Sequence, residues 1–307
     1  MNKLEVRVRI LAHTIILLLK YRPWGKVVKP MIIYMIDGSM HHHSGLADRI
    51  RQIMGIYAIC KNRGYKFGLI ANHPFELSNY LVPEYDWRIT KENYSLNIFS
   101  ARPLYLGFRS KEKYKSMLTL KKRQLHVYAS IHWGLINELG YNMEQLFWEL
   151  FDPIPEIKEF IRKYKEQYSS WDCVHFRFQN ILGDFNEPKI QTLNESEKDN
   201  LRNKCFKYVF EESKRTVQPL LVCSDSDSFL QEVSTIPGVI ILPGEPIHID
   251  YTRHNNFEMH LKNFLDFFMI SESESVRSVS TNLMYRSDFP ALAASIKNVP
   301  FKRVDLD

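Results

Sequence analysis

The residues best suited to chemistry end a short stretch, Trp-Asp-Cys-Val-His-Phe-Arg, at positions 171 to 177. The stretch is apolar and rich in β-forming residues, which predicts a strand. Side chains two positions apart leave a strand on the same face, so His175 and Arg177 should project together where the strand stops. A cation displayed at a strand tip can hold an anion, although many buried strands also end in polar residues.

A second polar group stands at the start of a predicted helix. Gly45, Asp48 and Arg49 follow the first predicted strand and open a helix over 46–63. Free backbone N–H groups and the helix dipole favour an anion at such a position. The group is therefore a candidate for binding a charged ligand.

Two further motifs follow strands of the second half. Ser-Asp-Ser-Asp at 224–227, which includes Asp225, could bind ribose hydroxyls or could cap the next helix. Ser287, in Tyr-Arg-Ser-Asp-Phe, could cap a helix or give its hydroxyl to a phosphate. Ligands of parallel α/β sheets collect outside the carboxyl ends of the strands. The shared location of these motifs is a stronger argument than any one of them.

Three consecutive histidines, His41 to His43, suggest a metal at first sight. Adjacent histidines on an extended loop point in alternating directions, and no cysteine or acidic cluster of ligand spacing lies nearby. We therefore expect no metal there. These imidazoles would more readily line a cleft, where they could meet sugar or phosphate oxygens.

The elements that must position these residues alternate between strand and helix. Strands are predicted at 31–36, 67–71, 171–177, 219–223, 238–242 and 276–281, and helices at 46–63, 143–167 with a break at 152–155, 196–214, 257–272 and 288–296, with a short helix after Ser226. Residues 90–140 show no clean period. The polar run before Trp171 predicts a domain boundary between residues 168 and 169. This pattern predicts an α/β fold with two Rossmann-like domains, 1–168 and 169–307, facing each other across a cleft.

Composition sets the broad class. The chain has 307 residues, 45% hydrophobic and 25% charged, which suits a globular protein of two domains. The net charge of +6 is spread along the sequence, so it favours anions in general and no nucleic-acid partner. The four cysteines are far apart and sit in apolar runs, which predicts buried, reduced thiols in a cytoplasmic protein.

One apolar segment, Ile10 to Leu19, is flanked by Arg7, Arg9, Lys20 and Arg22. A run of about ten residues is too short to span a bilayer, and no small-residue cleavage site follows. Two interpretations remain. The segment is a helix packed on the body, which we favour, or residues 7–22 rest on the anionic inner face of a membrane.

Taken in order, four motifs resemble a known family. They are Ser-Gly-Leu-Ala-Asp-Arg-Ile, Val-His-Phe-Arg-Phe-Gln-Asn, Val-Cys-Ser-Asp and Ser-Asp-Phe-Pro-Ala-Leu-Ala-Ala. Their order resembles the GDP-fucose-dependent fucosyltransferases of GT-B fold, the group with α-1,2-, α-1,6- and protein O-fucosyltransferases. The resemblance runs from about residue 32 to residue 296. It implies a GT-B fold with residues 1–168 on the acceptor side and 169–307 on the GDP-sugar donor side.

The resemblance also implies roles for individual residues. Arg177 would bind the β-phosphate of the GDP-sugar through bidentate, charge-assisted bonds, with His175 beside the nucleotide. Asp266 falls where the family places a carboxylate for the N1–H and N2–H of guanine, and the alternative is a solvated aspartate on a helix face. Ser287 would take the phosphate-binding place near the last helix. The loop residues Gly45, Asp48 and Arg49 match the family's N-terminal Gly-x-Gly-Asp-Arg loop.

The chemistry implied is direct displacement at the anomeric carbon of fucose, with inversion. Arginine and backbone dipoles, without a metal or other cofactor, would neutralise the leaving diphosphate. A general base would take the proton of the acceptor hydroxyl, and we prefer Asp184 over Asp48 and Glu187. The expected protein is thus an inverting fucosyltransferase that uses GDP-fucose and a glycan acceptor in polysaccharide biosynthesis, with bacterial surface glycan as the expected acceptor class.

Three positions depart from the family pattern. Asn180 stands where the family often has an aspartate, Ala47 replaces the loop's second glycine, and Phe178 replaces an arginine. A residue with a Cβ restricts positive φ angles, so Ala47 implies a different loop path. Asn180 and Ala47 keep open the alternative of a GT-B-shaped binding protein with a decayed site. A transferase that uses another nucleotide sugar is a further alternative.

Overall fold

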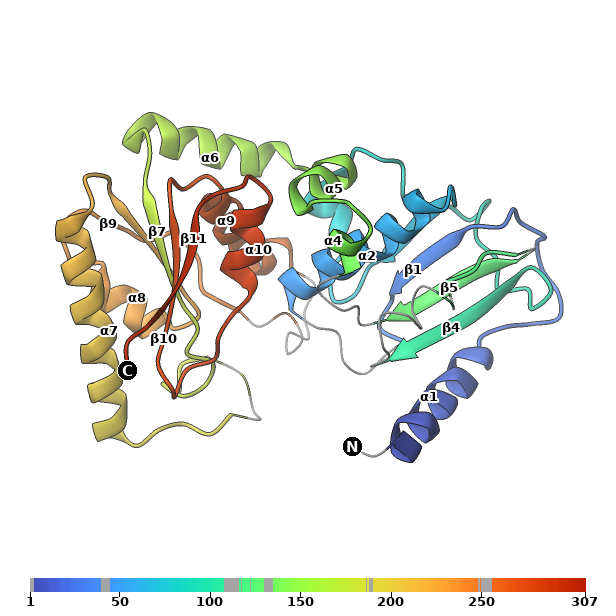
Figure 1. Ribbon diagram of the computed structural model, residues 1–307, viewed down its shortest axis with the longest axis horizontal. Helices are drawn as coiled ribbons and strands as arrows, with labels where there is room; N and C mark the ends of the chain where they lie inside the picture. The colour runs from blue at the N-terminus through green and yellow to red at the C-terminus, as the bar shows by residue number, and fades with distance from the viewer. Residues whose placement is uncertain are drawn as a thin grey trace. The chain divides into compact units, whose positions relative to one another are not determined.

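The computed structural model describes residues 3–39, 45–107, 116, 118–121, 123–129, 135–185, 187, 190–247, 249 and 256–307 (Figure 1). The histidines at 41–43 lie outside this range. The chain divides into two compact units. One comprises Met1–Ser44 and Asp48–Asp152, and the other comprises Gly45–Ala47 and Pro153–Asp307.

The first unit is built on a four-stranded parallel sheet in the order β2-β1-β5-β4. Its strands are β1 (Ile32–Ile36), β2 (Phe67–Ala71), β4 (Ala101–Gly107) and β5 (Gln124–Ala129). Helix α2 (Leu46–Asn62) joins β1 to β2, as the sequence predicts, and Gly64 follows it with φ +66°. Tyr34 of β1 donates to Gln52 of α2 at 2.5 Å, so α2 covers one face of the sheet.

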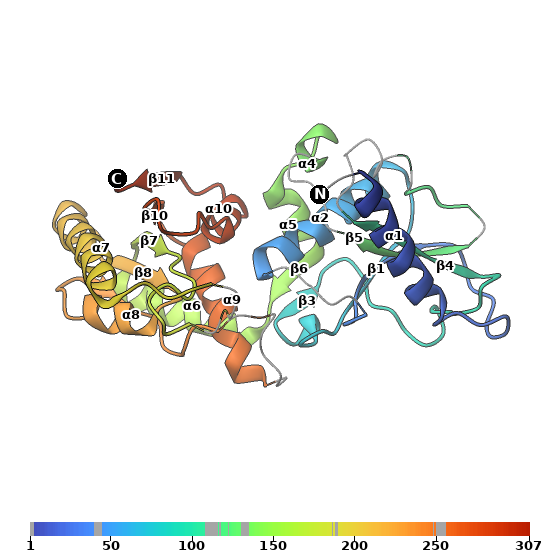
Figure 2. The same ribbon diagram turned by 90° about the horizontal axis from the view of Figure 1, so that it is seen from below.

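Helix α1 (Lys3–Leu18) lies on the other face of this sheet (Figures 1 and 2). Leu17 joins a buried cluster with Met31, Ile33, Met35 and Tyr128. The ring of His13 stacks on Tyr105 of β4 at 4.7 Å. The prediction that this segment packs on the body of the protein is therefore confirmed for one face of the helix.

Smaller elements complete the first unit. They are η1 (Leu77–Asn79), β3 (Leu81–Pro83), α4 (Leu135–Glu138), α5 (Met143–Leu150) and β6 (Phe151–Pro153), which pairs with β3. The side chain of Asn142 caps α5 by accepting from the backbone N–H of Gln145. The described helices include none with the length and hydrophobicity needed to cross a bilayer.

The second unit holds a five-stranded parallel sheet in the order β11-β10-β7-β8-β9. Its strands are β7 (Asp172–Phe176), β8 (Leu220–Ser224), β9 (Val239–Ile240), β10 (Val276–Ser280) and β11 (Phe301–Asp305). Its helices are α6 (Pro155–Tyr168), α7 (Glu195–Arg215), α8 (Asp227–Val233), α9 (Phe257–Ser271) and α10 (Phe289–Ser295). Both sheets are parallel and covered by helices, as expected for Rossmann-like units.

Successive side chains of β7 point to opposite faces of the second sheet, so they pack into the core on both faces. Val174 and Phe176 point into a cluster with residues of α7 and α8. On the other face His175 meets Phe289 of α10 at a ring distance of 5.9 Å. Trp171, just before β7, is buried and donates to the carbonyl of Met269 in α9. Thus β7 is central and both of its faces are covered.

The elements predicted from the sequence match closely, but the strands β3, β4, β5, β6 and β11 were not predicted. The compact units also divide earlier than the predicted boundary between residues 168 and 169. Helix α6 belongs to the second unit, where its Lys165 pairs with Glu272 after α9 at 2.6 Å. The assignment of acceptor and donor sides stays a prediction. All four cysteines are buried and free, as predicted.

Candidate functional site

Arg177 lies at the carboxyl edge of the second sheet, directly after β7. Its Nη1 is 2.9 Å from Oδ2 of Asp225, which directly follows the neighbouring strand β8. Its Nη2 is 3.4 Å from Oε2 of Glu187, and its guanidinium lies over the ring of Phe185 at 4.7 Å. The side chain is 21% exposed. The arginine is thus held from three sides and still reaches solvent.

Asp225 fixes the loop that carries this arginine. Its carboxylate accepts the backbone N–H of Phe178 at 2.8 Å and that of Gln179 at 2.7 Å. Burial raises the pKa of Asp225, while Arg177 and these N–H groups act in the opposite direction. The helix-capping alternative belongs to its neighbour Ser226, whose hydroxyl accepts from the N–H of Phe229. A ribose contact by Asp225 stays a prediction.

Asp184 contacts the start of α8. Its Oδ2 accepts the hydroxyl of Ser226 at 2.7 Å, the backbone N–H of Ser228 at 3.0 Å and the hydroxyl of Ser228 at 2.6 Å. These bonds tie the loop after β7 to the helix after β8. A role for Asp184 as general base stays a prediction.

Glu187 and Asn180 lie on the same loop. Glu187 faces Arg177 and accepts from Nε2 of Gln179 at 3.2 Å. Asn180, at the position where the family often has an aspartate, donates to the carbonyl of Ile190 at 2.9 Å. Phe178, which replaces an arginine, is fully buried in the core. Two of the three departures from the family pattern therefore support the local structure.

His175 is buried beside Arg177. Its side chain is 7% exposed, and its Nδ1 has no hydrogen-bond partner among the described residues. Burial lowers the pKa of His175 to about 3, and Arg177 and Lys262 add to this effect. The imidazole is therefore neutral at physiological pH, and one of its nitrogens could bond a ligand.

Asp266 is a buried residue of α9, so the alternative of a solvated aspartate is wrong. It is 8% exposed, and Nζ of the buried Lys262 lies 2.5 Å from its Oδ1. Burial raises the pKa of Asp266, while Lys262 lowers it. Gly244, after β9, has φ +98° and lies against the stem of Lys262, where an added Cβ would sit 3.4 Å from the lysine Cβ. The role in guanine binding stays a prediction.

Ser287 is 7% exposed and precedes α10. Its hydroxyl accepts from the N–H of Phe289 at 3.2 Å, although the N-cap residue of α10 is Asp288, so Ser287 stands one residue before the cap. The ring of Phe289 in turn lies beside His175. The structure thus brings Ser287, His175, Arg177 and Asp225 into one neighbourhood of the second unit.

The predicted residues at the start of α2 are less suited to ligand binding. Gly45 is exposed, and Asp48 pairs with Arg51 at 3.3 Å. Arg49 is only 5% exposed, and its Nη1 donates to the carbonyl of His73 at 2.5 Å. Ala47, the third departure from the family pattern, is buried in the first turn of α2. Arg49 therefore supports the fold, and a ligand role for these residues stays a prediction.

Asp37, which was not among the predicted site residues, directly follows β1 at the carboxyl edge of the first sheet. Its Oδ1 accepts the N–H of Ser39 at 3.0 Å, and its Oδ2 lies 3.4 Å from the hydroxyl of Tyr128 and 3.5 Å from Nζ of Lys20. Burial raises the pKa of Tyr128, and Asp37 raises it further, so the phenol keeps its proton. The rule that found Arg177, a polar residue after a buried strand, would have found Asp37 as well. Such a carboxylate, 17% exposed, can accept a proton.

Metal ligands are not clustered in the part of the chain that the structure describes. There, no three side chains of histidine, cysteine, aspartate or glutamate are placed to hold one ion. The polar groups that do gather at the carboxyl edge of the second sheet are an arginine, a neutral imidazole and carboxylates. The arginine and the imidazole of this set can bind an anion through hydrogen bonds, and the carboxylates position the arginine.

The sequence matches no family model and no curated protein. Solved structures do match in fold. A mutant FUT1 of Arabidopsis thaliana in complex with GDP is 10% identical, with a TM-score of 0.57 over 95% of this chain and 74% of that chain. The fucosyltransferase NodZ from Bradyrhizobium is 14% identical, with a TM-score of 0.56 over 91% of this chain and 96% of that chain.

A NodZ α-1,6-fucosyltransferase soaked with GDP-fucose is similar as well. It is 13% identical, with a TM-score of 0.53 over 87% of this chain and 93% of that chain. The protein has the GT-B fold. The predicted fold class is therefore confirmed, with two Rossmann-like units that each carry a parallel sheet.

Proposed function

We propose that the protein is an inverting glycosyltransferase that moves fucose from GDP-fucose to a hydroxyl of a glycan acceptor. The observation that carries the proposal is Arg177, held by Asp225 at the carboxyl edge of the second sheet. This edge is where α/β folds bind nucleotides. Support comes from the shared fold, since the similar structures include one in complex with GDP and one soaked with GDP-fucose.

Arg177 would bind the β-phosphate of the donor. Its contact with Glu187, at 3.4 Å, is longer than its contact with Asp225, at 2.9 Å. An incoming diphosphate can therefore take the place of Glu187 while Asp225 keeps the guanidinium oriented. Bidentate, charge-assisted bonds would then stabilise the charge that develops on the leaving diphosphate.

Other residues of the second unit would hold the rest of the donor. We assign His175 to the nucleotide, because its imidazole is neutral and its Nδ1 is available. Asp266 would accept the N1–H and N2–H of guanine, with Lys262 keeping the carboxylate ionised. Ser287 would donate its hydroxyl to a phosphate oxygen, and Asp225 would act by positioning Arg177.

Transfer needs one bond to form and one to break. The acceptor oxygen bonds to the anomeric carbon, and the bond from that carbon to the β-phosphate oxygen breaks, so the configuration inverts. The acceptor proton passes to a carboxylate. Asp184 is the candidate from the sequence, while Asp37 is a second candidate, supported by its place on the presumed acceptor side and by its side chain, which is 17% exposed. No metal or other cofactor enters this scheme.

A nucleotide panel tests the donor assignment. Thermal denaturation would be followed with GDP, UDP, GDP-fucose and GDP-mannose. We expect GDP and GDP-fucose to stabilise the protein and Arg177→Ala to lower GDP affinity roughly 100-fold, since two charge-assisted hydrogen bonds are lost. Arg177→Lys keeps the positive charge but cannot form two parallel hydrogen bonds, so its GDP affinity should lie between those of the wild type and Arg177→Ala.

Each alternative has its own outcome. Stabilisation by UDP and not GDP would show that the protein uses another nucleotide sugar. No stabilisation by any nucleotide, with no transfer from any donor, would show a GT-B-shaped protein with a decayed site. Transfer of labelled fucose that Arg177→Ala leaves unchanged would remove Arg177 from the donor site.

We further propose that the reaction serves polysaccharide biosynthesis at the cytoplasmic face of a membrane, with peripheral contact through residues 7–22. Support comes from the outward face of α1. Leu11, Ile15 and Leu19 are 61%, 50% and 80% exposed, although all three are hydrophobic. Arg7, Arg9 and Lys20 flank this face. An apolar face bordered by cations is typical of helices that lie on anionic membranes.

A further inference from the structure

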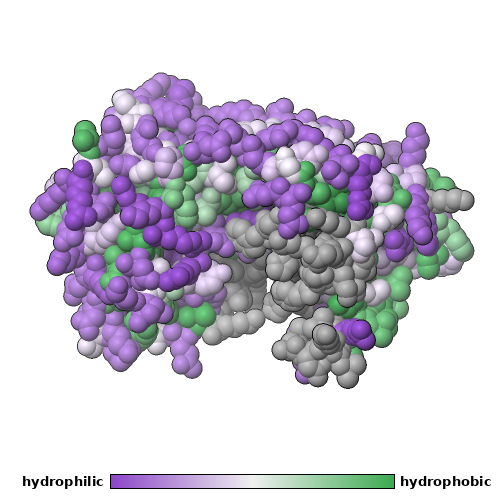
Figure 3. All heavy atoms as spheres, in the orientation of Figure 1, coloured by the Kyte–Doolittle hydropathy of each residue, from purple (hydrophilic) through white to green (hydrophobic). Residues whose placement is uncertain are grey.

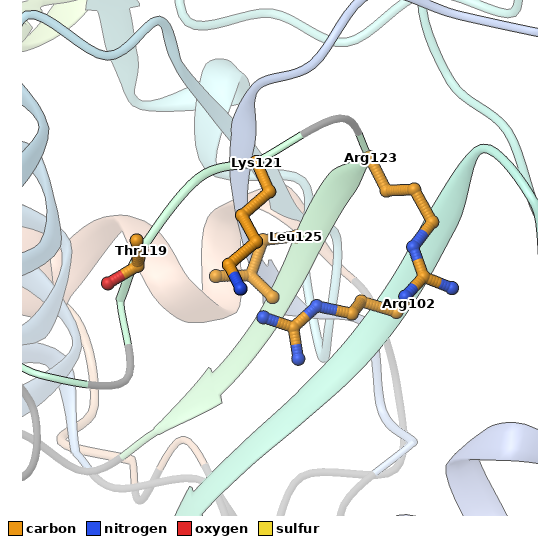
Figure 4. Close-up of a pocket in the computed structure, with 5 residues that line it drawn as sticks. All are labelled: Arg102, Thr119, Lys121, Arg123 and Leu125. Carbon is orange, nitrogen blue, oxygen red and sulfur yellow. The ribbon is translucent and has the colours of Figure 1, made fainter.

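Three cationic side chains surround one pocket of the first unit. Arg102 of β4 and the pair Lys121 and Arg123 before β5 line it, together with Thr119 and Leu125 (Figure 4). The pocket has a volume of about 190 Å³. Arg102 is in register with Leu125, each at the second position of its strand. The pocket therefore lies at the amino end of the first sheet, whereas Asp37 lies at the carboxyl edge.

These cations have no carboxylate partner in the part of the chain that the structure describes. Among the described residues, no carboxylate lies within 4.0 Å of the charged nitrogens of Arg102, Lys121 or Arg123, and Arg123 instead donates to the carbonyl of Ile98 at 3.1 Å. Burial lowers the pKa of Arg102, and the charge of Arg123 lowers it further. The amine of Lys121 is turned toward the guanidinium of Arg102 (Figure 4). Such a cluster of like charges is stabilised by an anion, and a phosphate group fits the volume.

Hydrophobic loop tips adjoin this pocket. Trp24, Val27 and Phe99 are 63%, 86% and 74% exposed. Their two loops are joined by backbone bonds between Arg22 and residues 96 and 98, each at 2.9 Å. Arg123 bonds to the carbonyl next to Phe99. The apolar tips and the cationic pocket are therefore parts of one end of the unit.

The carboxyl end of α1 approaches the same end of the sheet from its opposite face, because Tyr105 and Tyr128 face α1 while Arg102 and Leu125 point away from it. The helix ends at Leu18, and the chain reaches the joined loops at Arg22 only a few residues later. Hydrophobic side chains gather over α1 in Figure 3. Further cations on this side are Lys26 and Lys29, and the described acidic residues there include Glu5 of α1, Asp37, which pairs with Lys20, and the exposed Glu92, which interacts with Lys26. Positive charge therefore outweighs negative charge around the apolar tips.

We propose that the amino end of the first sheet docks, together with α1, on a membrane surface rich in anionic lipid. The pocket between Arg102, Lys121 and Arg123 takes the phosphate of a lipid headgroup. Aromatic and aliphatic tips among cations suit the boundary between headgroups and acyl chains, whereas a soluble phosphate would make no use of them. The surface is separate from the donor site, so this inference does not depend on GDP or fucose.

Vesicle binding tests the proposal with the full chain. Co-sedimentation would compare vesicles of phosphatidylcholine alone with vesicles that also contain phosphatidylglycerol, at low and high salt. We expect binding to the anionic vesicles that weakens at high salt, because salt screens the attraction of exposed charges. Quenching of tryptophan fluorescence by brominated lipid should occur as well and should be lost in Trp24→Phe.

Variants separate the pocket from the general charge of the protein. Each Lys or Arg near an anionic surface contributes about fivefold to binding, so the triple variant R102Q/K121Q/R123Q should bind about 100-fold more weakly. The matched control K163Q/K207Q/K214Q removes three lysines of the second unit, of which Lys163 and Lys207 are 67% and 77% exposed. It should bind as the wild type does.

The apolar tips have their own variants. Trp24→Ser and Phe99→Ser should each weaken binding about tenfold, since each removes a large side chain from the apolar boundary. Val217→Ser, at a position in the second unit that is 97% exposed, should not change it. These variants test insertion, whereas the triple variant tests the phosphate pocket.

Three results would overturn the proposal. The first is no binding of the wild type to either kind of vesicle. The second is equal binding of the wild type and R102Q/K121Q/R123Q to anionic vesicles. The third is a wild type that sediments as a dimer and binds no vesicles, while Trp24→Ser or Phe99→Ser sediments as a monomer. That result would assign the surface to a second copy of the chain. Retention of GDP binding in the triple variant shows that the donor site is intact in every case.

Discussion

Cationic side chains cluster in two regions of this molecule, and the two regions differ in whether carboxylates pair with these cations. At the carboxyl edge of the second sheet, Arg177 pairs with Asp225 and Lys262 pairs with Asp266. At the amino end of the first sheet, Arg102, Lys121 and Arg123 surround a pocket without a carboxylate of the described residues in reach. The first region supplies its own counter-charges, whereas the described residues of the second supply none.

The difference indicates what each region is built for. A paired arginine is held in one geometry before any ligand arrives, which suits a step that needs precise stabilisation of developing charge. Unpaired cations at an exposed end attract an anionic surface over a longer distance and tolerate looser geometry. We therefore expect that removing a charge at the carboxyl edge of the second sheet destabilises the protein. Removing a charge at the amino end of the first sheet should not.

The largest effect should come from Asp225→Ala. The change leaves the N–H groups of Phe178 and Gln179 and the guanidinium of Arg177 without their acceptor. We expect a loss of about 3 to 5 kcal/mol in the free energy of unfolding, measured with urea. Asp225→Asn, which still accepts hydrogen bonds, should lose less. Equal stability of Asp225→Ala and the wild type would contradict the paired description of this edge.

Asp37 allows the carboxyl edges of the two sheets to be compared. If the acceptor proton passes to Asp37, Asp37→Asn should lower kcat about 100-fold and leave GDP affinity unchanged. Asp184→Asn is the matched variant in the second unit, where the side chain binds Ser226 and Ser228. Steady-state transfer of labelled fucose and GDP titration would measure both quantities. A large loss of kcat in Asp184→Asn alone would restore the assignment made from the sequence.

The sequence predicts the elements whose hydrophobic periodicity matches the side chains that they bury. The helix over 46–63 and the strand at 67–71 have clear periods, and the glycine at 64 ends the helix. Strand β5 could not be predicted from its hydrophobic pattern, because the polar residues Gln124 and His126 are buried within it. Their polar groups are satisfied by distant partners, the carbonyl of Asn93 and the hydroxyl of Tyr21, which no local pattern reveals.

The candidate site could be located but not completed from the sequence. Residues that follow strands gave Arg177 and Asp225, and adjacency of β7 and β8 explains why they meet. The partners of Asp184 and Asp266 depend on how helices α8 and α9 lie against neighbouring elements, so their hydrogen bonds could not be read in advance. The pocket at Arg102 also depends on register between β4 and β5, neither of which was predicted.

Acid should weaken the paired region through His175. Its pKa is lowered from an ordinary 6.5 to about 3 in the folded protein, so the unfolded chain binds a proton that the folded chain does not. Stability is therefore complete above about pH 6.5 and falls as the pH drops toward 3, by about 1.6 kcal/mol between pH 6.5 and pH 5. His175→Gln should lack this part of the pH dependence in urea unfolding. An identical pH dependence in the variant would show that the pKa of His175 is the same in the folded and unfolded chain.

The smallest effect, and the counterpart of Asp225→Ala, should come from Arg102→Gln. Loss of one charge from the unpaired cluster removes repulsion by Arg123, and no carboxylate of the described residues loses a partner. We expect the free energy of unfolding to stay unchanged or to rise by about 0.5 kcal/mol at low salt, and the gain to vanish at high salt because screening removes the repulsion. Urea unfolding at both salt concentrations measures it, with Lys207→Gln as an exposed control. A loss above about 1 kcal/mol would mean that Arg102 is bonded into the fold, and the contrast between the two regions would then fail.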